Sequence, residues 1–100
     1  MRLKPLYGSA GGQLVALGAG TAVYGFGLIS GAGAASCNFL TGGAGGDVLG
    51  SCAVSAAGGA DRDQVIYGGH IYFEDGVYVA VGGAVYSYWI LVYDGAREGT

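Results

Sequence analysis

Residues 35–56, "ASCNFLTGGAGGDVLGSCAVSA", place a glycine-rich segment between two short apolar runs, each carrying one cysteine. The segment lacks the Lys-Ser/Thr pair that follows a phosphate-binding glycine loop, and the run after it is typical of a strand rather than a helix. The glycines therefore predict the turn of a β-hairpin. Folding the chain about their middle pairs three sets of residues: Cys37 with Cys52, Leu40 with Leu49, and Ala35 with Val54.

This register brings the only two cysteines of the chain face to face. Directly opposed Cβ atoms at non-hydrogen-bonded positions lie roughly 4.5–5.5 Å apart, whereas a disulfide needs about 3.5–4.5 Å. We expect a buried pair of free thiols at Cys37 and Cys52, and a disulfide remains the alternative. A metal site would need two more ligands, and His70 is a weak candidate.

The rest of the chain predicts an all-β fold. No long segment repeats apolar residues with helical spacing, and each of the frequent glycines would cost a helix roughly 1 kcal/mol. Short runs rich in Val, Ile, Leu, Tyr and Phe alternate with glycine turns, which is typical of a sandwich or barrel. About eight strands are expected, at residues 14–17, 21–30, 34–41, 47–55, 64–67, 70–73, 76–81 and 85–93. The segment "FEDGV" predicts a tight hairpin around Gly76.

The length of 100 residues predicts one domain. Residues 1–12 hold the only proline and show no alternation, so we expect an N-terminal arm there and a single β-sandwich domain over residues 13–100. An arm of this kind is usually ordered only when it docks on something, so order in it would indicate a partner.

The composition indicates an assembly component. Hydrophobic residues make up 52% of the chain and charged residues 11%, against about 25% charged residues in typical soluble domains. So few charges cannot cover a monomer's surface, which favours an oligomer or a docked partner. In the last predicted strand, both faces are apolar or aromatic. Four Lys and Arg residues and a net charge of -3 argue against nucleic-acid binding.

No charged residue lies between Lys4 and Asp47, but an export signal or membrane span is not expected there, because the apolar run is broken by Gly18, Gly20, Gly25 and Gly27. The catalytic hypothesis would use Cys37 or a serine as nucleophile and His70 as base. His70 opens the apolar run "HIYF", so a strand-end histidine is the simpler interpretation. We therefore expect no enzyme, no cofactor and no metal.

Two further features have simple interpretations. The charged segment around Asp61, Arg62 and Asp63 is most simply a solvated loop, then an intersubunit ion pair, and last a calcium site, because the full ligand set is missing. The eight tyrosines and Trp89 are explained by core and interface packing, with a sugar-binding platform as the alternative.

The pattern resembles a group of small all-β structural proteins of tailed bacteriophages. In these proteins a Tyr-Gly-hydrophobic strand precedes a glycine hairpin. An element of an aromatic, acidic or amide residue, Gly and Tyr/Val then precedes a final strand of small and aromatic residues. The resemblance covers roughly residues 12–95, and the two cysteines and the high glycine content depart from it. The matching residues are Tyr24, Gly25, Leu28, Asp47, Leu49, Tyr72, Phe73, Gly76, Val77, Tyr78 and Val79.

The resemblance implies a jelly-roll-like antiparallel β-sandwich, in a non-enzymatic decoration or cement protein that stabilises the capsid exterior. It implies a virion location after assembly in the host cytoplasm, a homo-oligomer with a trimer favoured, and the major capsid protein or another virion protein as partner, without nucleic acid or membrane. The alternative is a receptor- or glycan-binding module of a head fibre or tail. The candidate contact residues are Arg2, Lys4, Leu6, Tyr7, Tyr86 and Tyr88.

Overall fold

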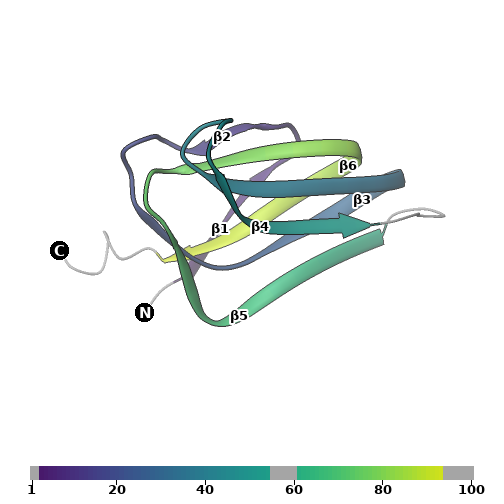
Figure 1. The fold of residues 1–100 in the computed structure, drawn as a ribbon. Coiled ribbons are helices and arrows are strands. Elements are labelled where there is room, and N and C mark those ends of the chain that lie inside the picture. The colour runs from purple at the N-terminus through teal and green to yellow at the C-terminus, as the bar shows by residue number, and fades with distance from the viewer. Residues whose placement is uncertain (1–2, 55–60, 94–100) are drawn as a thin grey trace.

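The computed structural model describes residues 3–54 and 61–93, which form six antiparallel strands (Figure 1). None of these residues belongs to a helix, so the described chain contains no helix long and apolar enough to cross a membrane. The strands are β1 (Leu3–Gly8), β2 (Gly12–Val15), β3 (Thr21–Thr41), β4 (Asp47–Val54), β5 (Asp61–Phe73) and β6 (Val77–Tyr93).

The two longest strands, β3 and β6, pair along their lengths and bend together, so each contributes to two layers. We name the layers sheet I and sheet II. Sheet I contains β1, the second half of β6, the first half of β3, and β5, in that order. Sheet II contains β2, the first half of β6, the second half of β3, and β4. When each half of β3 and of β6 is counted as a strand, the two four-stranded layers form an eight-stranded jelly-roll sandwich. This confirms the predicted fold class.

The bend has a local cause in the backbone. Ser30 pairs with Val85, and the next pair joins Ala35 to Gly83, so β3 spends several residues where β6 spends one. Gly83 has a φ of +74°, a conformation that side chains rarely adopt. A Cβ there would lie 2.2 Å from the carbonyl oxygen of Ala34. Glycine is therefore required at the corner where the chain passes from sheet II to sheet I.

The hairpin register is confirmed over most of its length, with Cys37 opposite Cys52 and Ala35 opposite Val54. The predicted pairing of Leu40 with Leu49 is wrong, because a register shift after Phe39 pairs Leu40 with Val48 and leaves Leu49 as the extra residue of a bulge.

Other connections differ from the sequence-based expectation. The turn after β5 is not a hairpin: β5 pairs with β3, whereas β6 begins in sheet II, so Gly76 lies in a crossover between layers. The expected strands at 64–67 and 70–73 both belong to β5, which pairs with β3 on either side of a four-residue bulge. Within the expected N-terminal arm, Leu3–Gly8 form β1, and the strand to which they are hydrogen-bonded is the chain's own β6.

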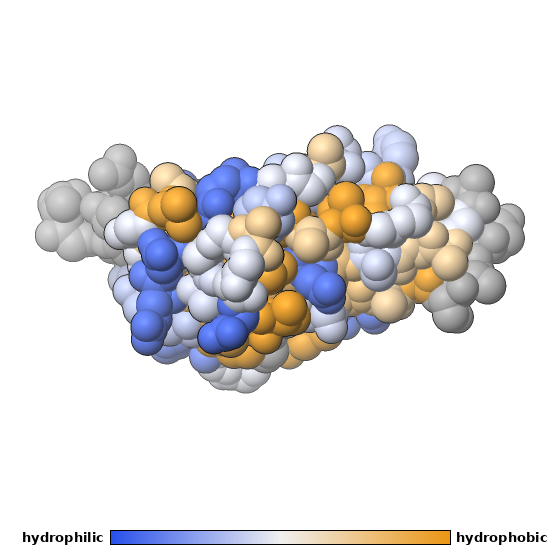
Figure 2. All heavy atoms as spheres, turned by 45° about the horizontal axis from the view of Figure 1, so that its top comes forward, coloured by the Kyte–Doolittle hydropathy of each residue, from blue (hydrophilic) through white to orange (hydrophobic). Residues whose placement is uncertain are grey.

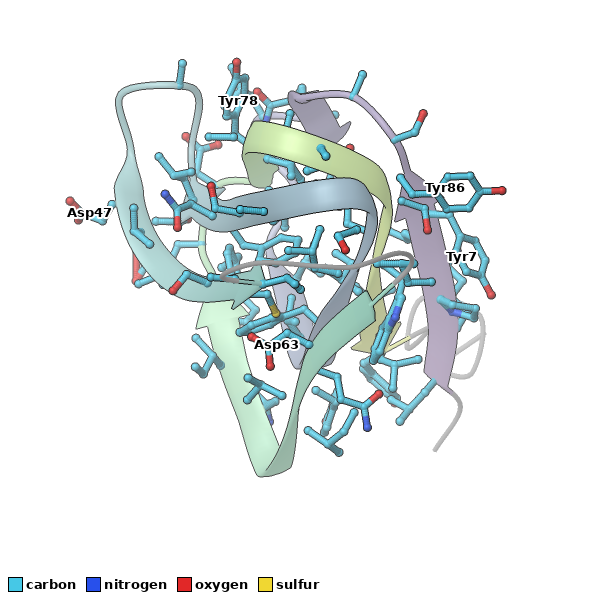
Figure 3. All side chains as sticks on the ribbon, turned by 90° about the vertical axis from the view of Figure 1, so that its right-hand side faces the viewer. Tyr7, Asp47, Asp63, Tyr78 and Tyr86 are labelled. Carbon is cyan, nitrogen blue, oxygen red and sulfur yellow. The ribbon has the colours of Figure 1, made fainter. Side chains whose placement is uncertain are left out.

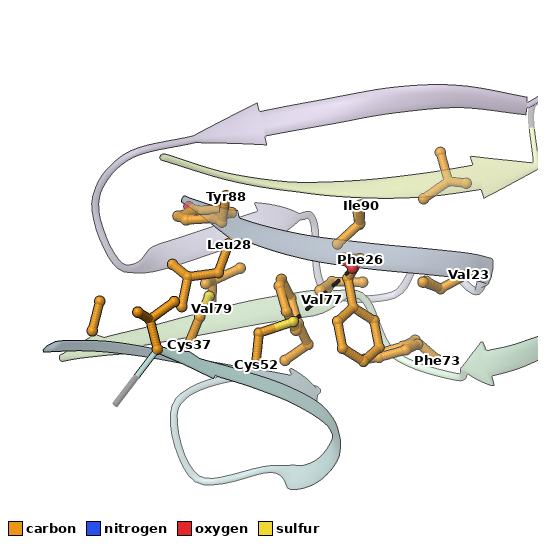
Figure 4. Packing of buried hydrophobic residues seen from close by; sticks show 14 residues of the cluster. Val23, Phe26, Leu28, Cys37, Cys52, Phe73, Val77, Val79, Tyr88 and Ile90 are labelled. Carbon is orange, nitrogen blue, oxygen red and sulfur yellow. Dashed lines mark hydrogen bonds between the residues drawn. The ribbon is translucent and has the colours of Figure 1, made fainter. Parts of the chain in front are cut away.

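The core fills the space between the two sheets (Figure 4). The rings of Phe26 from sheet I and Phe39 from sheet II lie 4.8 Å apart in a tilted pair. Tyr88 meets Phe39 edge to face at 6.2 Å, and its hydroxyl donates a 2.7 Å hydrogen bond to the carbonyl oxygen of Ala10. This bond satisfies the one polar atom of a buried ring and ties the β1–β2 connection to the core.

Candidate interaction surface

The cysteine pair lies inside the core and is chemically shielded. Cys37 is 0% exposed and Cys52 3% exposed, and both are free thiols in this structure. The Cys52 thiol donates a weak 4.0 Å hydrogen bond to the carbonyl oxygen of Phe26 (Figure 4). Burial is the larger cause that raises the pKa of the Cys37 thiol to about 12, and electrostatic repulsion from Cys52 is the smaller one. Burial and then Asp63 raise the pKa of Cys52 to about 12. Neutral, buried thiols are poor nucleophiles.

His70 lies elsewhere, in the bulge of β5, where it is exposed and its ring is 5.2 Å from that of Tyr24. Within the described part of the chain, no three His, Cys, Asp or Glu side chains are grouped closely enough to hold a metal ion. Asp63 accepts a 3.0 Å hydrogen bond from the backbone N–H of Ala53, which links β5 of sheet I to β4 of sheet II. In the structure Asp63 is thus a bridge between edge strands. The side chains of Asp61 and Arg62 lie outside the described ones.

Asp75 organises the opposite end of the sandwich. Its carboxylate accepts a hydrogen bond from the N–H of Gly18, its own N–H donates to the Thr41 hydroxyl at 3.2 Å, and its carbonyl accepts from Gly42 at 2.9 Å. Three connections therefore meet at one residue, through its carboxylate, its N–H and its carbonyl oxygen. In Figure 2 most of the hydrophilic surface lies in the left half of the molecule, where Figure 1 shows these turns.

The outer side of sheet I is the feature with the clearest potential for interaction, and we call it the aromatic face. Its members follow from the register: residues paired with Trp89 and Leu91 point away from the core, because Ile90 and Val92 between and after them are buried. The face comprises Leu3, Pro5 and Tyr7 of β1, Ser87, Trp89, Leu91 and Tyr93 of β6, Gly25, Gly27 and Ile29 of β3, and Gln64 and Ile66 of β5.

No described side chain of the aromatic face is charged; at its corner, Arg62 pairs with Ile29, and its side chain is outside the described ones. Several large apolar groups on the face are open to solvent, with Tyr7 69% and Ile66 57% exposed. Lys4, between Leu3 and Pro5 of β1, alternates to the other side of the sheet. Contiguous uncharged apolar surface of this kind usually marks a contact with another molecule.

Trp89 lies flat on this face. A Cβ added to Gly27, its partner on β3, would lie 2.3–2.5 Å from three atoms of the indole. One side of the ring therefore packs on the glycine backbone, and the other side is directed away from the sheet. Trp89 also lines a hollow of about 340 Å³ together with Pro5, Tyr7 and Leu91. The alternation in the sequence placed Trp89 on one side of the last strand. It could not show that the indole packs on Gly27, because that contact depends on the pairing of two strands that are distant in sequence.

The six predicted contact residues lie in different surroundings in the structure. Tyr7 and Tyr86 point outward side by side next to β1 (Figure 3), each 69% exposed. Tyr86 is the extra residue where the register shifts between Ile29 and Ser30, and this bulge accompanies its outward position. Tyr88 is 3% exposed and belongs to the core cluster, and the partly buried Leu6 packs against that cluster. Tyr88 is therefore corrected from a partner contact to a core residue, and Leu6 to a residue at the margin of the core. Lys4 is exposed on β1, and Arg2 lies outside the described residues.

Comparison with known proteins gives little. No family model matches the chain, and no curated protein matches it. Among solved structures, one similar chain belongs to a structure described as "Bacillus endospore appendages form a novel family of disulfide-linked pili". The two chains share 15% sequence identity with a TM-score of 0.39, over 92% of this chain and 87% of that chain. At this similarity, nothing about the present chain is inferred from it.

Proposed function

We propose that this chain is a non-enzymatic structural subunit of a virion that decorates the exterior of a capsid and stabilises the shell. The observation that carries the proposal is the aromatic face, which is four strands wide and has no charged side chain among those described. Interfaces favour Tyr and Trp at their centres and exclude charge there. A subunit that buries this face against a neighbour removes apolar surface from water, and each joint of the shell gains that free energy.

The sandwich itself suits such a role. Its core residues come from both sheets, and β3 and β6 run continuously through both layers. The two layers therefore cannot separate unless both strands straighten at the bend. The buried thiols, with pKa values raised to about 12 by burial, give the core no reactive group at neutral pH. These are properties of a mechanical element.

The test compares the melting temperature of shells assembled with and without this chain. Shells that carry the chain should melt at a higher temperature, and shells carrying Tyr7→Glu chain should fall back toward undecorated ones, because the exposed ring lies on the aromatic face. Ser51→Glu is the matched control, since Ser51 is exposed on the outer side of sheet II. Equal melting temperatures with and without the native chain would rule out a stabilising role.

The hollow beside Trp89 supports a second candidate, a receptor- or glycan-binding module. A flat indole beside Tyr7 is suited to stacking on the apolar side of a sugar ring. Trp89 is the only tryptophan of the chain, so its fluorescence would change when a sugar covers it. A saturable change with a neutral oligosaccharide, lost in Tyr7→Ala, would favour this candidate, and no change with any member of a glycan panel would count against it.

A further inference from the structure

The aromatic face carries a hollow near one edge of sheet I and an exposed apolar side chain near the other edge. The hollow of about 340 Å³ lies over β1 and β6, where Pro5, Tyr7, Trp89 and Leu91 line it. The exposed side chain is that of Ile66 on β5, which is 57% exposed. The Ile66 side chain leans toward β3 and covers the glycine paired with it, since a Cβ on Gly25 would lie 2.9 Å from the Ile66 Cδ1 atom.

The strand register places the hollow and Ile66 in the same row across the sheet. Pro5 pairs with Leu91, Leu91 with Gly25, and Gly25 with Ile66. Since neighbouring strands are about 4.8 Å apart, the first and last members of the row are separated by roughly 14 Å.

The adjacent row has the same organisation. Tyr7 pairs with Trp89, Trp89 with Gly27, and Gly27 with Gln64. Each row therefore has a member that lines the hollow at its β1 end and an exposed side chain, Ile66 or Gln64, at its β5 end.

We propose that the aromatic face binds a second copy of this chain, related by a twofold axis that runs parallel to the strands between β6 and β3. Such an axis exchanges the two ends of each row. Ile66 of one copy then enters the hollow of the other, and the reverse happens at the same time, as a self-complementary contact requires. In the adjacent row, the Gln64 amide of each copy meets the Tyr7 ring of the other. This inference rests on the proposed function, of which it names a partner.

The absence of described charges on this face is compatible with a second copy as the occupant, and the area of the face sets the strength of the contact. Each chain has a net charge of -3, so two copies repel each other wherever like charges come together. No described side chain of the aromatic face is charged, so this repulsion is weakest there. Four strands at about 4.8 Å and six residues at about 3.3 Å give a face of roughly 19 by 20 Å, or about 380 Å². Two such faces bury about 760 Å² in total, less than the roughly 1,000 Å² of a stable specific interface, so the contact is a weak one. The expected dimer therefore dissociates on dilution.

The first experiment measures mass against concentration. Native mass spectrometry and sedimentation of the full chain should show monomers that convert to dimers, and Trp89 emission should shift to shorter wavelength over the same range. Ile66→Glu should weaken dimerisation at least tenfold, because the twofold axis places the new carboxylate in both hollows. Ser51→Glu adds the same charge on sheet II and should leave the dimer unchanged. Circular dichroism establishes that both variants are folded.

A second experiment tests the axis directly by cross-linking. In a mixture of Pro5→Cys chains and Ile66→Cys chains, a short bismaleimide should join one chain of each kind, because the axis places residue 5 of one copy near residue 66 of the other. Ile66→Cys chains alone should not be joined, since their two positions lie on opposite sides of the axis. The buried Cys37 and Cys52 serve as an internal background, measured with the native chain.

The outcomes separate this inference from the proposed function. A concentration-dependent dimer with the mixed cross-link supports it. A monomer at all concentrations, a trimer, or cross-linking of Ile66→Cys chains to one another overturns it, and so does saturable binding of a neutral oligosaccharide at Trp89 that leaves the mass unchanged. Shell melting tests the decoration role independently, so a stabilised shell with a monomeric free chain would overturn the twofold pairing alone.

Discussion

Gly27→Ala tests whether Trp89 is seated flat on the sheet. The added Cβ would lie 2.3 Å from the nearest indole atom, whereas ordinary contacts are 3.4–4 Å, so the ring must rise by about 1 Å or more. An aromatic side chain buries about 150–250 Å², and re-exposing a third of this at ~25 cal/mol/Å² costs about 1.3–2.1 kcal/mol. Replacing glycine by alanine in a strand returns about 0.5–1 kcal/mol. We expect a net destabilisation of about 1 kcal/mol.

The assay is urea denaturation of dilute protein, followed by Trp89 fluorescence and circular dichroism, with the native emission maximum recorded beforehand. The variant should emit at longer wavelength and unfold at lower urea. Gly33→Ala is the matched control in the same strand, because its Cβ would meet only the Ala84 Cβ at 3.7 Å; it should be as stable as the native chain or slightly more so. An unchanged emission maximum together with unchanged or increased stability of Gly27→Ala would refute the flat seating of the indole.

Three further predictions concern the core and the bend. Tyr88→Phe removes the hydrogen bond to the Ala10 carbonyl oxygen and should lower the free energy of unfolding by about 1 kcal/mol in urea titrations; an unchanged midpoint would contradict this. The pKa values of Cys37 and Cys52 are raised from 9.0 to about 12, so unfolding releases protons above pH 9 and stability should fall as the pH rises from 9.0 toward about 12. The double alanine variant should lose that pH-dependent component, and retention of the full slope would exclude the thiols as its source. Gly83→Ala forces a side chain into a φ of +74° against a backbone oxygen and should cost about 1–3 kcal/mol, measured as a lower melting temperature; native-like melting would show that the corner relaxes freely.

Local patterns account for much of the fold. The hairpin register across Cys37 and Cys52 is set by the position of the glycine turn, because strand pairing extends outward from a turn one residue at a time. The prediction failed at Leu49, where a bulge inserts one residue. Turn composition could not distinguish a hairpin from a crossover at Gly76, because a tight glycine turn permits both and the choice depends on which sheet offers a partner strand.

The candidate surface shows the same division. The scarcity of charge is a property of the amino-acid sequence, and the prediction of a partner is based on it. Which aromatic residues face outward was decided by the tertiary structure. In β6 both sides of the strand are apolar, so alternation alone cannot say that Tyr88 enters the core while Trp89 remains outside. That choice is made where β1 and β3 pair with β6, since Gly27 provides the seat for the indole and Tyr7 its neighbour. A row such as Pro5, Leu91, Gly25 and Ile66 joins four strands that are distant in sequence, and only long-range pairing in the folded sheet brings its members together.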